Sequence, residues 1–224
     1  MLIDLIKQIG SGSVNFQVVM AHLAAILMVI FLILPVHEFA HAGMAYLLGD
    51  KNIIKRGRLS LNPLAHIDIL GALCMLVFGF GWAKPVPINP QRFDRPRLYT
   101  AICAIAGPLA NILCGMLGGI LYLIIFKNNP EFVLTNAGRI VFMFLQYYVI
   151  INATLAVFNL IPIPPLDGSK VLFMFLPADI ERRISQYQQL FTIVIFALLY
   201  MGTLDGILDK GVSFVVDLCV LFQN

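Results

Sequence analysis

Two histidines and a glutamate on one helical turn form the strongest chemical pattern in the sequence. His37 and His41 lie four residues apart in His-Glu-Phe-Ala-His. On an α-helix this spacing places both imidazoles on one face, where they can bind the same metal ion. Zinc in such a site lowers the pKa of its bound water toward about 7, which gives hydroxide at neutral pH, and Glu38 is placed to take the proton of that water.

The surroundings of this motif favour metal binding over an ordinary packing role. The motif lies in a long apolar run at 18–49. One ionised residue at the centre of a membrane helix costs about 2.5–3.5 kcal/mol on insertion scales. In a soluble helix, two core histidines beside a stray glutamate would be a fair alternative. In an apolar run, three polar groups on one turn need a reason, and a bound metal provides it.

A third metal ligand is expected from a distant segment, because catalytic zinc usually keeps three protein ligands and one open position. The best candidate is Asp167, in the stretch Asn-Leu-Ile-Pro-Ile-Pro-Pro-Leu-Asp-Gly at 159–168. Its three prolines end the preceding helix, and Gly168 lets the chain turn inward. A solvated aspartate in a cytoplasmic turn is the alternative, and it would be preferred if the histidine motif were absent.

Asn159 is a weaker candidate, at the end of the same apolar run. Its amide can hydrogen-bond a substrate carbonyl or an oxyanion. Alternatively, it bonds between helices, as polar residues in membranes commonly do. His66 lies in a proline-containing loop and is interpreted as a loop histidine and not as a ligand.

The elements that must position these residues are membrane helices. Of 224 residues, 60% are hydrophobic and 12% charged, whereas soluble domains carry about 25% charged residues. One core of this size cannot bury so much apolar surface, so lipid must solvate part of it. We therefore expect an all-α polytopic membrane protein with about four to six membrane helices. Its net charge of +3 does not suggest a nucleic-acid partner.

Five apolar runs follow the short N-terminal stretch, besides a last one at 212–222. Spanning the hydrocarbon takes about 20 residues, and the runs long enough are 18–49, 99–126 and 140–163. The run at 190–204 is marginal, and 212–222 is short enough to be interfacial. The run at 69–82 is also short and holds three glycines.

The charged loops predict how the short run at 69–82 is placed. Residues 50–66 and 83–98 each hold four cations and one acid, which places both loops in the cytoplasm by the positive-inside rule. A full crossing between them would separate the two loops, so we expect a re-entrant and extended segment near 69–90. Residues 164–189 then face the cytoplasm as well, at a depth similar to that of the histidines.

Residues 81–90, Gly-Trp-Ala-Lys-Pro-Val-Pro-Ile-Asn-Pro, are typical of extended chain. Pro85 and Pro87 remove N–H donors from one edge and leave the other edge free to donate. Such a segment pairs with one partner only, and strand addition is one way to hold an unwound substrate. A proline-rich interfacial loop is an equally good interpretation. In the next apolar run, Gly107 and the Gly115-x-x-x-Gly119 spacing predict close helix packing.

Taken in order, these motifs resemble the site-2 protease family of intramembrane zinc metalloproteases. The resemblance rests on HEFAH at 37–41, AGPLAN at 106–111 and NLIPIPPLDG at 159–168. HExxH alone is moderately specific, but HExxH followed by N-L-x-P-x-x-x-L-D-G is strongly specific. The stretches at 61–68 and 81–90 are similar to a compact bacterial branch without PDZ or CBS domains.

The resemblance implies a role for each candidate residue. It makes His37, His41 and Asp167 the zinc ligands, Glu38 the general base and Asn159 a substrate-positioning residue. It covers about residues 20–185, the core of a single integral membrane metalloprotease domain expected over 1–224. Several relatives carry an extra first helix, where this chain has little sequence before its first apolar run.

The resemblance also implies the reaction and its setting. We expect hydrolysis of peptide bonds within or near transmembrane helices, in regulated intramembrane proteolysis that often follows a first cut by another protease. The expected partners are a transmembrane protein substrate, single-pass or other, and the lipid bilayer, with homo-oligomerisation left open. The protein is expected to be multi-pass in the cell membrane, with its active site toward the cytoplasm.

Two rival functions use the same residues. A metal transporter or sensor would bind metal without hydrolysis, but transporters usually show paired or inverted halves and several intramembrane carboxylates. We find neither in the sequence. A catalytically silent relative that acts as a chaperone or binding module would not need Glu38.

Overall fold

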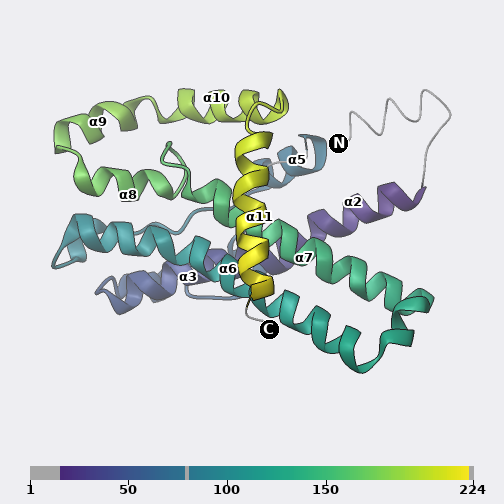
Figure 1. Ribbon diagram of the computed structural model, residues 1–224. Coiled ribbons are helices and arrows are strands. Elements are labelled where there is room, and N and C mark those ends of the chain that lie inside the picture. The colour runs from purple at the N-terminus through teal and green to yellow at the C-terminus, as the bar shows by residue number, and fades with distance from the viewer. Residues whose placement is uncertain (1–15, 79–80, 222–224) are drawn as a thin grey trace.

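The computed structural model describes residues 16–78 and 81–221, and its regular elements there are all helices (Figure 1). Three helical spans are long and apolar enough to cross a membrane: Leu23–Leu47, Pro96–Asn128 (α6) and Asn136–Leu160 (α7). They match the three long apolar runs, so the all-α membrane class is confirmed. Two shorter apolar helices, α5 (Ile69–Phe78) and α10 (Gln188–Tyr200), bring the membrane candidates within the predicted four to six.

The first span is built from three pieces. α2 (Phe16–Met28) continues into a π-helical turn at Val29–Ile33 and then into α3 (Leu34–Leu47). Pro35, at the start of α3, has no N–H to give to the preceding turn, and a widened π turn accommodates such a break. α3 ends before Gly49, whose φ of 122° is one that residues with a side chain rarely adopt.

α6 is the central helix of the described chain. α3, α7, α8 (Gly168–Phe175) and α11 (Asp205–Leu221) all pack against it. α6 and α7 pack closely at Gly118, where an added Cβ would lie 2.7 Å from the Tyr148 ring of α7; the predicted positions were its neighbours Gly115 and Gly119. α11 runs across α6 and α7 (Figure 1) and buries Val215 against Ala153. Two further helices, α9 (Ala178–Gln186) and α10, lie between α8 and α11 in sequence.

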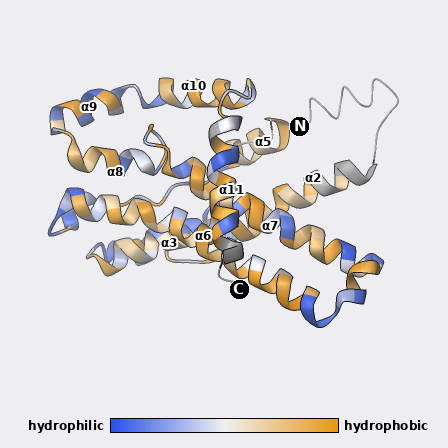
Figure 2. Ribbon diagram, in the orientation of Figure 1, coloured by the Kyte–Doolittle hydropathy of each residue, from blue (hydrophilic) through white to orange (hydrophobic). Residues whose placement is uncertain are grey.

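The two basic loops, 50–66 and 83–98, contact each other and the segment at 164–189 at one end of the helices. Arg56 donates to the carbonyl of Pro87, Arg92 Nη1 lies 2.9 Å from Asp50 Oδ1, and Arg97 Nη1 donates to the carbonyl of Leu176 at 3.0 Å. Figure 2 shows that hydrophilic residues gather at the helix ends and that α6 and α7 are largely hydrophobic between them. The short turn between α6 and α7, at Pro130–Leu134, lies at the opposite end (Figure 1).

This arrangement agrees with a re-entrant segment at 69–82. α5 has 10 residues, which at 1.5 Å per residue is about half of the roughly 30 Å hydrocarbon core. The chain then turns back: a Cβ added to Gly71 would lie 2.1 Å from the Trp82 carbonyl oxygen, and one added to Gly81 would lie 2.0 Å from the Gly71 carbonyl oxygen. The two glycines therefore let α5 pack backbone to backbone against the chain that follows it.

The segment after Gly81 is extended, as predicted, but its donor edge is not free. Ile67 and Ala83 form an isolated antiparallel bridge, and the Lys84 N–H donates to the His66 carbonyl at 2.8 Å. The N–H groups of Val86 and Ile88 also have acceptors, Glu38 Oε2 and the Val86 carbonyl. The edge predicted to donate therefore does donate, but its acceptors lie in the chain itself, so these N–H groups are not available to a substrate strand in this structure.

Site-directed labelling checks the shared side of the basic loops. Cysteines at the exposed positions Lys55 and Arg95 are expected to react with a membrane-impermeant maleimide from the same face, and a cysteine at the exposed Glu131 from the other face. Sealed vesicles of both orientations provide the readout, with the unsubstituted chain as the background. Labelling of positions 55 and 95 from opposite faces would show that α5 and the chain after it cross the membrane.

A second test concerns the Asp50–Arg92 ion pair. Asp50 is fully buried and also accepts the Asn89 N–H at 3.1 Å. Arg92→Ala leaves this buried carboxylate without its cation and is expected to lower the free energy of unfolding by about 1.5–3 kcal/mol. The exposed Arg95→Ala is the matched control, with an expected effect of about 0.5 kcal/mol or less. Unfolding in mixed detergent micelles measures both; equal effects would contradict the prediction.

Candidate metal centre

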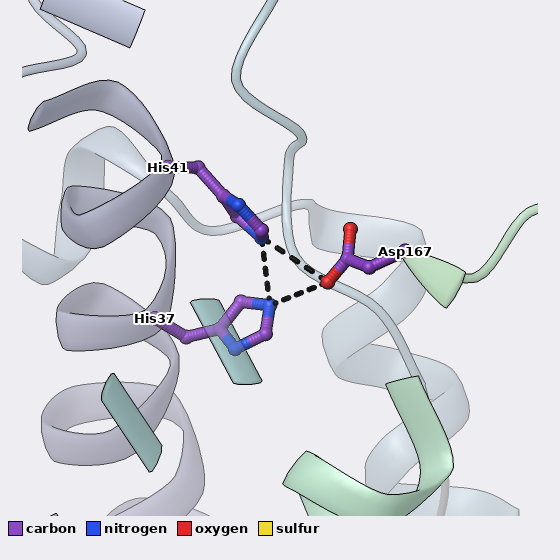
Figure 3. A group of neighbouring side chains, drawn as sticks. All are labelled: His37, His41 and Asp167. Carbon is purple, nitrogen blue, oxygen red and sulfur yellow. Dashed lines mark hydrogen bonds and ion pairs between the residues drawn. The ribbon is translucent and has the colours of Figure 1, made fainter. Parts of the chain in front are cut away.

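Three side chains from two distant segments converge beside α6 (Figure 3). His37 Nε2 and His41 Nε2 lie 3.0 Å apart, and Asp167 Oδ2 lies 3.3 Å from the first and 3.2 Å from the second. Within the described residues, these three form a group that could hold a metal ion. Both histidines are buried, and the Asp167 side chain is 23% exposed.

The three separations fit a tetrahedral zinc ion. Zinc binds histidine nitrogen and carboxylate oxygen at about 2.0–2.1 Å, so two ligand atoms in a tetrahedral site lie roughly 3.3–3.4 Å apart. The observed triangle of 3.0, 3.2 and 3.3 Å is close to this size. Hydrogen bonds have similar lengths, however, so the donors and acceptors must also be considered.

The proton on His41 can be assigned from its other nitrogen. His41 Nδ1 lies 2.7 Å from the Cys103 carbonyl oxygen on α6. A carbonyl only accepts, so Nδ1 carries the proton and a neutral His41 presents a lone pair at Nε2. This lone pair faces Asp167 Oδ2, which is also an acceptor. A cation between the two atoms, either a proton or a metal ion, must therefore offset the repulsion between them. Backbone carbonyls commonly orient metal-binding histidines by accepting a hydrogen bond from the other ring nitrogen.

Two polar atoms of the group are without ordinary partners. Asp167 Oδ2 and His37 Nδ1 are buried and have no hydrogen bond of good geometry among the described residues. Burial alone would raise the pKa of Asp167, but His37 and His41 outweigh it and hold this pKa well below its ordinary value. The carboxylate is therefore ionised at neutral pH, as a metal ligand must be.

Gly107 forms the wall behind both imidazoles. A Cβ at this position would lie 2.4 Å from His41 Nε2 and 2.6 Å from His37 Cε1. Real Cβ atoms essentially never come this close, so only glycine allows the two rings to reach Asp167. The sequence predicted close packing around Gly107, but the group that packs there is the histidine pair.

The end of α7 brings Asp167 into the site. α7 ends at Leu160, two residues before Pro162, and Asp167 is the residue at which α8 begins. The side chain of Asp167 does not cap α8 and is therefore available to the histidines. Gly168 is needed for close approach and not for an unusual φ, because its Cβ would lie 2.2 Å from the Leu160 carbonyl oxygen.

Glu38 is buried on the same helical turn and contacts the extended segment. Its Oε2 accepts the backbone N–H of Val86 at 3.1 Å. Its carboxylate is also close enough to His41 to interact with it electrostatically. The predicted general base therefore lies beside the metal group and is held by the chain that follows α5.

The two remaining candidates are not part of the metal group. Asn159 Nδ2 donates to the Leu155 carbonyl of its own helix at 3.0 Å, and nothing in this contact tests a role in substrate binding. His66 is buried, and its Nε2 contacts the Ser60 carbonyl at 2.7 Å, which agrees with its interpretation as a loop histidine.

Sequence reasoning missed two backbone groups of the site, the Cys103 carbonyl and the Val86 N–H. Every residue type has both groups, so neither leaves a compositional signal. The nearest signal for Val86 is its position between Pro85 and Pro87, which leaves one N–H among those three residues.

Comparison with known proteins identifies the family. The family model described as "Peptidase family M50" matches residues 117–202, which include Asp167 but not His37 or His41. The "Putative zinc metalloprotease YwhC" of Bacillus subtilis is 35% identical over 170 residues, which make up 76% of this chain and 77% of that protein. The chain belongs to peptidase family M50, the site-2 proteases.

Other relatives in the family carry similar names. The "Putative zinc metalloprotease Rip2" of Mycolicibacterium smegmatis is 29% identical over 77% of this chain and 65% of its own length. The "Putative zinc metalloprotease MJ0611" of Methanocaldococcus jannaschii is 35% identical over 46% of this chain and 49% of its own length. No solved structure matches the chain. As an M50 metalloprotease this membrane protein uses zinc, and the His37, His41 and Asp167 side chains fit that ion.

Gly107→Ala tests the close approach at the metal centre. The added methyl group overlaps both imidazoles, so zinc content is expected to fall well below one ion per chain, together with activity. Gly43→Ala on α3 is the matched control, because its Cβ would meet only Leu59 Cδ1 at 3.9 Å. Elemental analysis of detergent-purified, monodisperse protein measures the zinc. A full zinc content in Gly107→Ala would contradict the geometry described here.

Proposed function

We propose that this M50 protein is a zinc-dependent endopeptidase of the H-E-x-x-H type that cleaves membrane proteins within or near their transmembrane helices. The observation that carries the proposal is the triangle of His37, His41 and Asp167 with Glu38 on the same turn of α3. Two segments that are distant in sequence, α3 and the turn before α8, supply the three residues of the metal group, and the Glu38 carboxylate lies beside them. A general base of this kind is what hydrolysis requires in addition to metal binding.

The residues divide the work as follows. His37, His41 and Asp167 would hold the zinc ion, which would supply Lewis-acid chemistry for the scissile carbonyl and for water. Glu38 takes the proton of the attacking water as the new C–O bond forms. It then gives a proton to the leaving nitrogen as the C–N bond breaks. The Cys103 carbonyl keeps the His41 proton on Nδ1, so that Nε2 stays available to the metal.

The position of the site supports a membrane substrate cut near the cytoplasmic face. His41 lies on α3 about 9 Å before Leu47, at 1.5 Å per residue. Beyond Leu47 come the basic loops, which the positive-inside rule places in the cytoplasm. The proposal includes a multi-pass topology, a single protease domain, and a single-pass or other transmembrane protein as the substrate in regulated intramembrane proteolysis. Asn159 is proposed to position that substrate, and homo-oligomerisation stays open.

The burial and the hydrogen bond of Glu38 distinguish hydrolysis from the two rival functions. A transporter or sensor needs ligands but no buried carboxylate beside them, and a silent relative needs no base. In the described residues Glu38 is buried and oriented by a hydrogen bond, which favours hydrolysis over both rivals.

Two substitutions test the proposal with zinc and cleavage measured side by side. Glu38→Gln is expected to keep stoichiometric zinc and to lose cleavage of a single-pass model helix by about 10²–10⁴-fold. Asp167→Ala is expected to lose most of its zinc as well. A chelator should abolish wild-type cleavage, and added zinc should restore it.

Each rival makes a different prediction for the same proteins. Metal flux that persists in Glu38→Gln, without cleavage by the wild type, would favour a transporter. Folded wild-type protein that holds zinc but cleaves none of a panel of single-pass helices would favour a silent relative. The absence of zinc from folded wild-type protein would contradict the ligand assignment.

A further inference from the structure

The carboxylate of Glu38 is held by a backbone group and not by a side chain. The Val86 N–H donates to Glu38 Oε2 at 3.1 Å, and Glu38 is 8% exposed. In this low-dielectric setting, a hydrogen bond to an ionised carboxylate is stronger than one in water. One oxygen of the carboxylate is therefore fixed by the extended segment.

The two prolines beside Val86 determine which backbone N–H can bond to Glu38. Pro85 and Pro87 have no N–H, so Val86 is the one donor among these three residues. The N–H groups on either side, of Lys84 and Ile88, donate to the carbonyls of His66 and Val86. A shift of the segment by one residue would present a proline to Glu38, so the two prolines define the register of the contact.

The loops around the segment fix its position independently of Glu38. The Lys84 N–H is bonded to the His66 carbonyl at 2.8 Å, before the contact. After it, Arg56 binds the Pro87 carbonyl, and the Asn89 N–H donates to the buried Asp50 at 3.1 Å. The Val86 N–H is thus aimed at Glu38 by bonds on both sides and does not simply follow the carboxylate.

We propose that the Val86 backbone N–H is a positioning group for the Glu38 carboxylate, held in register by Pro85 and Pro87. This inference rests on the proposed function, in which Glu38 is the general base. It extends that function by giving the segment at 84–88 a role in the chemical step. A positioning group of this kind acts on the turnover step, so its loss should lower kcat and leave KM and zinc content nearly unchanged.

Val86→Pro removes the N–H and keeps an extended backbone, and Val86→Ala removes the side chain but keeps the N–H. For the single-pass helix that the wild type cleaves, Val86→Pro is expected to lower kcat by about tenfold to a hundredfold, the effect of one hydrogen bond to a charged group. Val86→Ala should stay within about threefold of the wild type, since it retains that bond. Both should retain zinc.

A backbone ester at position 86 covers the case in which Val86→Pro does not fold. It keeps the valine side chain and replaces only the N–H with an oxygen, and the same loss of kcat is expected. Equal kcat values for the N–H-deficient variant, Val86→Ala and the wild type, all with full zinc, would overturn the proposal. A change confined to KM would also overturn it, because the segment would then act in substrate binding.

Hydrogen exchange tests the contact without any substrate. From Lys84 to Ile88 the chain has three backbone N–H groups, because Pro85 and Pro87 have none. In Glu38→Ala the Val86 N–H loses its acceptor, so one additional amide of this segment should exchange at least about tenfold faster. Glu38→Gln is the control, because its amide oxygen can still accept the bond. Unchanged exchange in Glu38→Ala would overturn the proposal.

The two experiments separate this inference from the proposed function. If the wild type cleaves and Glu38→Gln does not, an unaffected N–H-deficient variant refutes the role of Val86 alone. If the wild type cleaves no helix, the proposed function fails, and the exchange measurement still decides whether Val86 holds Glu38.

Discussion

A polar atom inside a helix bundle in lipid has no water to bond with, so each one must be satisfied by the chain or by a bound ion. Four ionisable side chains of this protein, two histidines and two carboxylates, meet under this constraint. The carbonyl of Cys103 accepts a hydrogen bond from His41 Nδ1, and the N–H of Val86 donates one to Glu38 Oε2. The triangle of Nε2 and Oδ2 atoms that remains faces inward, and a divalent ion satisfies it.

The same constraint explains the glycines at the site and in the segments that support it. Polar groups can meet over such short distances only where the backbones come close together, and a Cβ would prevent this at three positions. Gly107 makes room for the imidazoles, Gly168 lets the start of α8 lie against the end of α7, and Gly71 lets α5 pack against the extended segment. In each case the glycine is required by a neighbouring atom and not by its own φ, which is not positive at any of the three.

The sequence predicted those parts of the site that follow from local geometry. The four-residue spacing of His37 and His41 fixes a shared helix face, and the prolines after Asn159 fix the place where α7 must end. The charged loops predicted that the chain returns after 69–82, and Arg56 and Arg92 do join the two loops.

Contacts that depend on tertiary packing could not be predicted in this way, because a carbonyl or an N–H carries no signature of its partner. The edge of the extended segment illustrates the difference: its prolines showed which N–H groups can donate, but not that Glu38 would accept one of them.

The metal centre joins a helix made early in synthesis to a turn made late. α3 enters the membrane long before Asp167 leaves the ribosome, and until α7 is in place the two histidines have no third ligand. A nascent chain that ends before Asp167 therefore has Glu38 and two of the three residues of the metal group, but not the complete group. The length of chain between His41 and Asp167 thus delays completion of the metal group until most of the fold has been synthesised.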